Sequence, residues 1–422
     1  MFGRRGQGLI RDRAGSLAAL TALMMPILIG TAGLASDTIQ WTLTKRMMQR
    51  AADSGAIAGA YQLSQTTGSN AQPVLDAALR DVNSNGGFVR TIAPVINTPA
   101  TSGSFRDANS AVEVILATDL RLPFTGLIMG GPVRISARAV AEIVGNGDYC
   151  VLALENTDTS GIPMGGNATV NLGCGMMSNA PSTNSITASG SSLITASPVA
   201  AVGNVPPGNY SPGSIRQEYA LPLRDPYRNL PDPAVTINGT SINVSPSGTG
   251  AFTSNFGSGT VFRNVDIKGT ATFGPGIYYV TGSLSFGSQS VVTSIGAVFI
   301  LTAANAASNT GSIATMNINA GAQLTMIAPT TGTYAGILMY QDRRASNIST
   351  NIVNGNSTSI LQGALYFPAQ QLQFNGTSGM NTRCVQIVAR RVDFRGNSNI
   401  QNVCPPASGA GSFRGTQIKL VA

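Results

Sequence analysis

The sequence contains no histidine, and only 10% of its 422 residues are charged. The lack of histidine excludes every acid–base, nucleophilic and metal-binding role of imidazole. The net charge is +8, but no basic run is longer than two residues. The clustered basic patch and interleaved aromatic residues typical of nucleic-acid binding are missing, so we expect no nucleic-acid partner. The dispersed charges predict a solvated surface, and attraction to acidic envelope polymers or lipid headgroups is the alternative.

Cysteine is also scarce, with four residues in two local pairs, Cys150 with Cys174 and Cys384 with Cys404. Four cysteines allow three connectivities. Local pairing would close two loops of about 20 residues, each contributing on the order of 3 kcal/mol in the chain-entropy model. We predict these two disulfides and therefore an oxidising compartment, with four reduced, buried thiols as the alternative. A zinc site is disfavoured because the chain has no Cys-x-x-Cys spacing.

One long segment has no charge at all, residues 14–35, AGSLAALTALMMPILIGTAGLA. As a helix it would measure roughly 33 Å, which is enough to cross a hydrocarbon core of about 30 Å. Pro26 is tolerated inside a lipid-embedded helix. We predict a retained transmembrane helix over 14–35, with a cleaved signal peptide as the alternative. Basic residues lie on both sides of the segment, so their count barely decides its orientation.

A helical pattern continues beyond this segment and becomes rich in small residues. Such residues let another helix or a sheet approach closely. We predict that they form a helix-packing interface, and ordinary packing in the core of one domain is the alternative. The residues of this interface are Ala51, Ala52, Gly55, Ala56, Gly59 and Ala60.

The motifs around the apolar segment follow a recognisable order. Arg13 and Gly15 open the segment, a Gly-Leu-Ala-x-Asp exit ends at Asp37, and Gln-x-Ala-Ala-Asp-x-x-Ala-x-Ala-Gly-Ala covers residues 49–60. This order resembles the N-terminal module of TadG-like proteins of the bacterial tight-adherence (Flp) pilus machinery. Related TadE-type pseudopilins carry a glutamate early in the span, where this chain has Leu20, so we expect a retained anchor rather than prepilin-style processing.

The resemblance implies where the protein lies and with what it acts. Residues 1–13 would be a basic cytoplasmic N-terminus, and the bulk of the chain would lie in the periplasm behind a single inner-membrane span. The expected partners are the inner membrane and other Tad/Flp pilus assembly proteins, in a role that supports surface adherence and biofilm formation.

Residues 36–148 read as a small α+β region. A short helix is expected over 71–82, and residues 111–122 and 132–144 alternate as strands. With the long helix before them, they suggest a pilin-like region. Residues 126–131, GLIMGG, are expected to form a turn or short helix between the strands, and without a P-loop lysine they do not predict a phosphate site.

Residues 149–422 change to short apolar runs separated by Gly, Asn, Ser and Pro. Many brief strands of this kind predict an all-β domain, a parallel β-helix with a β-sandwich as the alternative. Segments such as YCVLAL (149–154) and LQGALYFPAQQLQFNG (361–376) also resemble the C-terminal region of many TadG-like proteins. Residues 206–233 hold seven prolines and are expected to leave the coil as an excursion rather than to link domains.

A catalytic role depends on carboxylates, and these are few. Residues 156–160, NTDTS, faintly resemble a polygalacturonase motif that would make Asp158 an acid. Glycoside hydrolysis usually needs two carboxylates, and the acids after Cys150 are mostly isolated. We predict a protein that is not an enzyme and has no cofactor or metal. The alternative is an envelope-anchored protein that binds or cleaves polysaccharide. The polar segments 341–344 and 389–397 would be either a sugar- or partner-binding edge or charges on exposed coil faces.

Overall fold

A computed structural model shows two compact units, residues 1–144 with 418–422, and residues 145–417. We call them the N-terminal unit and the β unit. The boundary lies four residues before the predicted start of the all-β domain at 149, and the last five residues belong to the N-terminal unit rather than to the β unit. The structure describes residues 13–66, 71–355, 359–376, 380–382, 384–396, 399–402 and 413–421.

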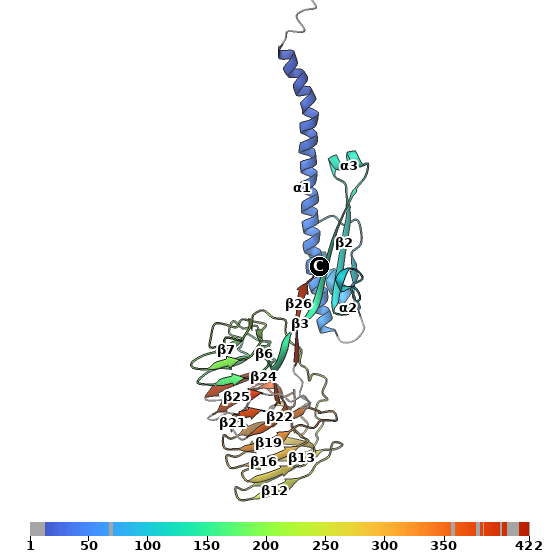
Figure 1. Ribbon diagram of the computed structural model, residues 1–422. Coiled ribbons are helices and arrows are strands. Elements are labelled where there is room, and N and C mark those ends of the chain that lie inside the picture. Colours follow the sequence, from blue (N-terminus) through green and yellow to red (C-terminus); the bar gives the residue numbers. More distant parts are fainter. Residues whose placement is uncertain are drawn as a thin grey trace, which may run out of the picture. The chain divides into compact units, whose positions relative to one another are not determined.

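The N-terminal unit combines helices with an antiparallel sheet (Figure 1). Its first strand pairs with its second, and the second pairs with the third over ten consecutive residue pairs. The expected helix over 71–82 and the two expected strands are present, and the GLIMGG segment contributes to a short helix. The elements are α1 (Arg13–Gln65), α2 (Gln72–Ser84), β1 (Val95–Asn97), η1 (Gly103–Phe105), β2 (Ala111–Leu120), α3 (Pro123–Met129) and β3 (Val133–Ala153).

Helix α1 is continuous over 53 residues, with Pro26 inside it. The predicted boundary between the span and the following region, at residues 35 and 36, is therefore not a break in the helix. The second half of α1 packs on α2 and β2, and the hydrophobic core between them is formed mainly from small and β-branched side chains, together with Met48 and Leu116. The antiparallel sheet and α2 thus fold onto one end of a helix whose other end projects from the unit.

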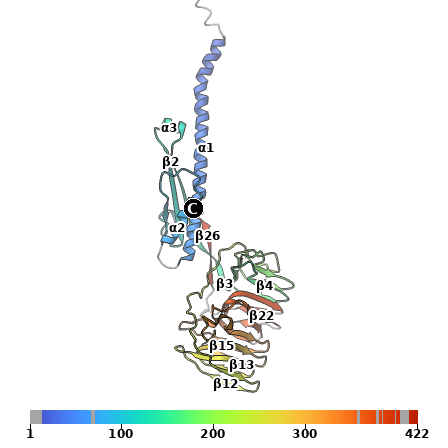
Figure 2. The ribbon, with the colours of Figure 1, turned by 180° about the vertical axis from the view of Figure 1, so that it is seen from behind.

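The β unit is a stack of short strands that pair in parallel, in a helix-like arrangement (Figures 1 and 2). Inward-facing aliphatic and aromatic side chains of successive turns form one long core. Parallel pairing differs from the antiparallel sheets of a β-sandwich, the alternative considered above. The described elements are β4 (Ile162–Met164), β5 (Thr169–Asn171), β6 (Gly175–Ser178), β7 (Ile186–Ala188), β8 (Leu193–Thr195), β9 (Val199–Ala201), β10 (Arg216–Gln217), β11 (Thr240–Val244), β12 (Thr249–Phe252), β13 (Thr260–Ile267), β14 (Thr270–Phe273), β15 (Gly276–Phe286), β16 (Val291–Ile295), β17 (Ala297–Leu301), η2 (Thr310–Ser312), β18 (Thr315–Ile318), β19 (Gln323–Ile327), β20 (Ile337–Gln341), β21 (Thr350–Gly355), β22 (Ile360–Gly376), β23 (Met380–Thr382), β24 (Cys384–Gly396), β25 (Asn399–Asn402) and β26 (Phe413–Leu420).

The turns of this stack do not follow the order of the chain. From β3 the chain winds in one direction through β6 to β9 and β10. It resumes at β11 and winds through β13, β15, β17, β20 and β22 to β24. Strand β24 then pairs in parallel with β3, which closes the two series into one stack. The chain must therefore cross from one end of the stack to the other between β10 and β11.

Residues 218–233, the second half of the proline-rich stretch 206–233, make most of this crossing, and we call residues 218–233 the strap. The strap passes the turns in their spatial order. Leu223 exchanges hydrogen bonds with Asn179 beyond β6, and Asp225 accepts one from Tyr366 of β22 at 2.7 Å. Burial raises the pKa of Tyr366, so its phenol stays protonated and can donate. The expected excursion over 206–233 therefore begins only after β10, because residues before it still pair within the stack.

The polar segment 341–344 holds the strap in place. Arg343 donates to the backbone carbonyls of three strap residues, Tyr227, Arg228 and Leu230. Arg344 binds both the strap carbonyl of Pro233 and the carboxylate of Asp342, whose side chain is fully buried. The sequence predicted either a binding edge or exposed coil charges for this segment. The structure shows neither role, because Arg343 and Arg344 bind groups within the β unit.

The second polar segment, 389–397, also ties parts of the β unit together. Arg390 pairs with buried Glu155 at 3.0 Å, and Arg391 donates to the carbonyl of Ser160 at 2.8 Å. Both contacts join β24 to the loop after β3. Arg395 is more exposed and pairs with Asp393 on its own strand. The segment is thus mainly a clamp within the stack, not a free edge.

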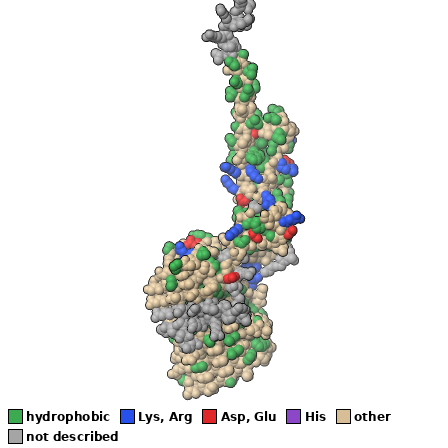
Figure 3. All heavy atoms as spheres, in the orientation of Figure 1, with side chains coloured by type: hydrophobic (Ala, Val, Ile, Leu, Met, Phe, Trp, Pro, Cys, Tyr) green, Lys and Arg blue, Asp and Glu red, His purple; other side chains and the backbone are tan. Residues whose placement is uncertain are grey.

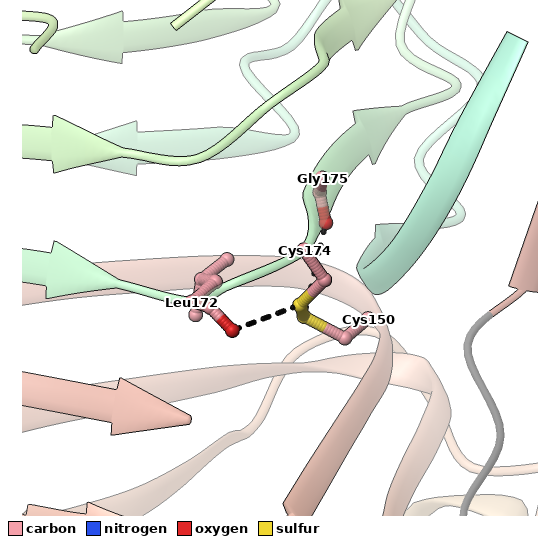
Figure 4. The surroundings of a disulfide bond; sticks show 4 residues. All are labelled: Cys150, Leu172, Cys174 and Gly175. Atoms are coloured by element: carbon pink, nitrogen blue, oxygen red, sulfur yellow. Dashed lines mark hydrogen bonds between the residues drawn. A yellow bond between two sulfur atoms is a disulfide. The ribbon is translucent and has the colours of Figure 1, made fainter. Parts of the chain in front are cut away.

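One predicted disulfide lies within the described residues. Cys150 and Cys174 are joined, with their Cα atoms 5.9 Å apart, and the carbonyl oxygen of Leu172 lies 3.1 Å from the sulfur of Cys174 (Figure 4). The bond links the end of β3 to the residue before β6, so it secures the first turn of the stack. The other predicted pair, Cys384 with Cys404, lies outside the described side chains.

Candidate functional site

The first half of helix α1 has the surface of a membrane span. Only 6% of its most apolar window is buried, and it is the one described helix long and apolar enough to cross a membrane. Leu23 and Leu28 are 72% and 65% exposed. In Figure 3 hydrophobic side chains cover this part of α1, and Lys and Arg side chains gather further along the unit. The described side chains of the predicted span at 14–35 are therefore mostly uncovered, and α3 contacts the span only near its end, at Gly33.

The second half of α1 shows the opposite surface. Ala51, Ala52, Ala56 and Ala60 are completely buried, and Gly55 and Gly59 are buried with them. A Cβ atom on Gly55 would lie 2.5 Å from Val82 of α2, and one on Gly59 would lie 2.8 Å from Val112 of β2. This burial corresponds to the alternative given above, ordinary packing in the core of one domain. These six residues pack inside the N-terminal unit because α2 and β2 occupy their face.

Polar residues of the same helix bind the adjacent sheet. Lys45 donates to the carbonyl of Ser136, and Gln49 donates to the carbonyl of Arg138 at 2.9 Å and to Asp53 of its own helix at 2.7 Å. Lys45 and the Gln-x-Ala-Ala-Asp motif thus have a structural role, which is to align α1 along β3.

Helix α3 packs on α1 between its two halves, at Gly33 and Asp37. Asp37, which is 1% exposed, accepts hydrogen bonds from the backbone N–H groups of Phe124 and Thr125, the former at 2.9 Å. A carboxylate at this place satisfies free amides at the start of α3 and complements the helix dipole. The Phe124 ring occupies the place that a Cβ atom on Gly33 would take. No sequence pattern indicated these contacts beyond the presence of Gly33 and Asp37 in the exit motif.

A buried glutamate stabilises the pairing of β2 with β3. Glu113 of β2 is fully buried and pairs with Arg138 of β3 at 2.8 Å. Burial by itself would raise the pKa of Glu113, but hydrogen bonds from Ser102, Thr101 and Asn97 outweigh it and lower the pKa from 4.5 to about 2. This carboxylate is structural, because all of its partners are internal.

We expect the N-terminal unit to lose stability in acid because of Glu113. A lowered pKa in the folded state means that the stabilisation is complete above pH 4.5 and is lost as the pH falls towards about 2. The shift corresponds to about 3 kcal/mol. Amide exchange of β2 and β3 in the full-length protein, measured between pH 5 and 2, would report it. Glu113→Gln should be less stable at pH 5 and should lose this part of the pH dependence, and an unchanged pH profile would contradict the assignment.

Two grooves lie among the described residues of the β unit, and neither is lined by a pair of carboxylates. One groove of about 680 Å³ is lined by polar side chains that include Asn238, Arg263 and Asn264, and none of its lining residues is acidic. A second, of about 420 Å³, contains Asp393, which is paired with Arg395. Asp158 is exposed in the loop after β3. Among the described residues no cluster of three or more potential metal ligands occurs.

Comparison with known proteins locates one match, on helix α1. Residues 15–62 match the TadE/G-like Flp pilus-assembly domain. Helix α1 is therefore similar to the TadE/G-like segment over these residues. The match begins at Gly15 and ends within the buried half of α1, so it covers both the apolar span and the small-residue face. No curated protein and no solved structure matches the chain. The finding supports a TadG-like protein and involvement in Tad/Flp pilus assembly.

Proposed function

We propose that the protein is a non-enzymatic, membrane-anchored component of Tad/Flp pilus assembly that supports surface adherence and biofilm formation. The observation that carries the proposal is the division of the TadE/G-like segment into an exposed apolar half and a half built into a folded unit. A helix of this kind crosses the inner membrane once and holds a pilin-like head next to it. The β unit, as a parallel β-helix, lies in the periplasm with that head.

Several features support a binding or structural role over catalysis. Glu155 is the acid nearest to Asp158 in the sequence, and its carboxylate is occupied by Arg390 and by Thr157. The usual glycosidase mechanism needs two carboxylates on either side of the bond. No such arrangement lines the grooves described above. The protein acts through its surfaces and needs no cofactor.

A genetic experiment tests the function. In a strain that lacks the gene, we expect few surface pili and few adherent cells, and the wild-type chain should restore both at matched protein levels. Asp158→Asn should restore them equally well. Normal piliation of the deletion strain would refute the assembly role, and a selective defect of Asp158→Asn would favour catalysis.

The orientation has its own test. A C-terminal tag should resist protease in intact cells and be cleaved in spheroplasts, because the disulfide between Cys150 and Cys174 belongs to an oxidising compartment. Protection of the tag in spheroplasts would place the β unit in the cytoplasm and contradict the proposal.

Binding of envelope polysaccharide is a second candidate. The polar groove of about 680 Å³ in the β unit favours it, since Asn238, Arg263 and Asn264 supply hydrogen-bond donors for acidic sugars. Retention of Arg263→Ala and wild-type protein on immobilised cell-surface polysaccharide would distinguish the roles. A loss of retention in the variant, with piliation unchanged, would support this candidate.

A further inference from the structure

Helix α3 exposes three consecutive large apolar side chains at the end of the β2–β3 hairpin. Leu127, Ile128 and Met129 are 85%, 74% and 71% exposed, and we call them the α3 tip. Single exposed apolar residues are common on soluble proteins, but a contiguous group of this size marks an interaction site. Hydrophobic side chains are visible on the surface where Figure 1 places α3 (Figure 3).

The α3 tip is held at a defined level along α1. Asp37 binds the first amides of α3, and the ring of Phe124 lies directly on Gly33. Gly33 is near the end of the 14–35 span, and the helix from residue 14 to residue 33 is roughly 30 Å long, the thickness of a hydrocarbon core. The tip therefore lies beside the point at which α1 leaves the bilayer.

The residues around the tip match the chemistry of a bilayer surface. Leu34 and Ile39 are 43% and 60% exposed on the adjoining part of α1, so apolar side chains remain exposed on α1 at the level where α3 binds. Trp41, the one tryptophan in the chain, is 42% exposed one turn further along, and tryptophan is enriched at membrane interfaces. Exposed Arg121 precedes α3 and would face anionic headgroups.

We propose that the α3 tip inserts into the interfacial region of the same bilayer that α1 crosses. This inference rests on the proposed anchoring by α1. The tip places its apolar side chains among the upper acyl chains, as interfacial apolar residues do, and Arg121 contacts anionic lipid headgroups. With Asp37 and Gly33 coupling α3 to α1, the N-terminal unit gains a second attachment point, which fixes its tilt on the membrane.

Tryptophan quenching in vesicles tests this contact. The full-length protein carries Trp41→Phe and Leu127→Trp and is reconstituted in phosphatidylethanolamine–phosphatidylglycerol vesicles whose acyl chains are brominated near the glycerol end. We expect a blue-shifted emission that brominated lipid lowers by about twofold or more. Because Leu127 is 85% exposed, the substitution leaves the core untouched, and circular dichroism should show an unchanged fold.

Two matched variants give the quenching expected for a probe inside the bilayer and for a probe outside it. Leu28→Trp places the probe in the span, and Leu79→Trp places it on α2, where the preceding residue, Ala78, packs near Gly55 and Gly59. Gly55 is 20 residues beyond Ala35, or roughly 30 Å along the helix. The probe at 28 should be quenched and the probe at 79 should not.

The outcomes separate the tip from the anchor. Suppose that the probe at 28 is quenched but the probe at 127 is as accessible to water as the probe at 79. This result would overturn the inference about the tip and leave the anchor intact. An unquenched probe at 28 would overturn both. A water-accessible probe at 127 in vesicles, combined with photo-crosslinks from that position to another pilus assembly protein in cells, would assign the tip to a protein partner instead of lipid.

Discussion

Replacing Gly55 and Gly59 together by leucine is expected to unfold the N-terminal unit. A Cβ atom at Gly55 meets Val82 at 2.5 Å and the backbone oxygen of Ala78 at 3.2 Å, and one at Gly59 meets Val112 at 2.8 Å. These neighbours are fully buried and belong to two different elements, so neither can move alone. Two overpacked sites should cost on the order of 5 kcal/mol, which is comparable to the whole stability of a small unit. Amide exchange of α2 and β2 in the reconstituted protein would measure the loss.

A matched control uses the opposite face of the same helix turns. Ile57 and Tyr61 are 42% and 40% exposed, so Ile57→Leu with Tyr61→Leu should leave the exchange of α2 and β2 unchanged. The β unit should stay protected in both double variants. If the glycine variant kept normal protection of α2 and β2 and still lost piliation, the small-residue face would have to serve a partner subunit after all.

These glycines also show what a sequence pattern does not predict, namely which element packs against a given face. Periodicity identified α1, α2, β2 and β3 because each pattern is local and repeats within the element itself. A helix face made of small residues indicates only that another helix or a strand packs closely against it. Whether that neighbour is α2 of the same chain or a helix of another protein depends on contacts between distant residues, and a single sequence does not contain them.

The same limit applies to the β unit, where local patterns predict the strands but not which distant strands pair. Short apolar runs predicted a parallel stack, and seven prolines predicted an excursion, because both depend on local composition. The pairing of β24 with β3 joins residues that are more than 200 positions apart, and no local pattern indicates it. The sequence around Arg343 likewise shows only its charged neighbours, whereas its carbonyl partners in the strap lie 113 to 116 positions away.

The junction at Asp37 is a further case. The exit motif of the TadG-like resemblance includes Gly33 and Asp37, yet their purpose is visible only with α3 in place. Glycine makes room for the ring of Phe124, and aspartate binds two amides of a helix that begins 86 residues later. Resemblance therefore located the residues, and the contacts explain them.

Two arginines in the middle of the apolar segment are expected to release the protein from the membrane. Leu23 and Ile27 are 72% and 56% exposed on α1 and lie near the centre of residues 14–35. On insertion scales each arginine at this depth costs roughly 3 kcal/mol, so Leu23→Arg with Ile27→Arg should shift most of the protein from the carbonate-resistant membrane pellet to the soluble or degraded fraction. Immunoblots of the fractions against the C-terminal tag would measure the shift, and surface pili should fall with it.

The control keeps the same two charges on the same helix but beyond the span. Ile39→Arg with Trp41→Arg alters side chains that are 60% and 42% exposed, and arginine is tolerated near the interface, so the protein should remain in the pellet. Retention of the Leu23→Arg, Ile27→Arg protein in the pellet would mean that another part of the chain holds it to the membrane. A soluble wild-type protein whose N-terminus begins after residue 35 would show instead that the segment is a cleaved signal peptide, and it would remove the anchor from the proposed function.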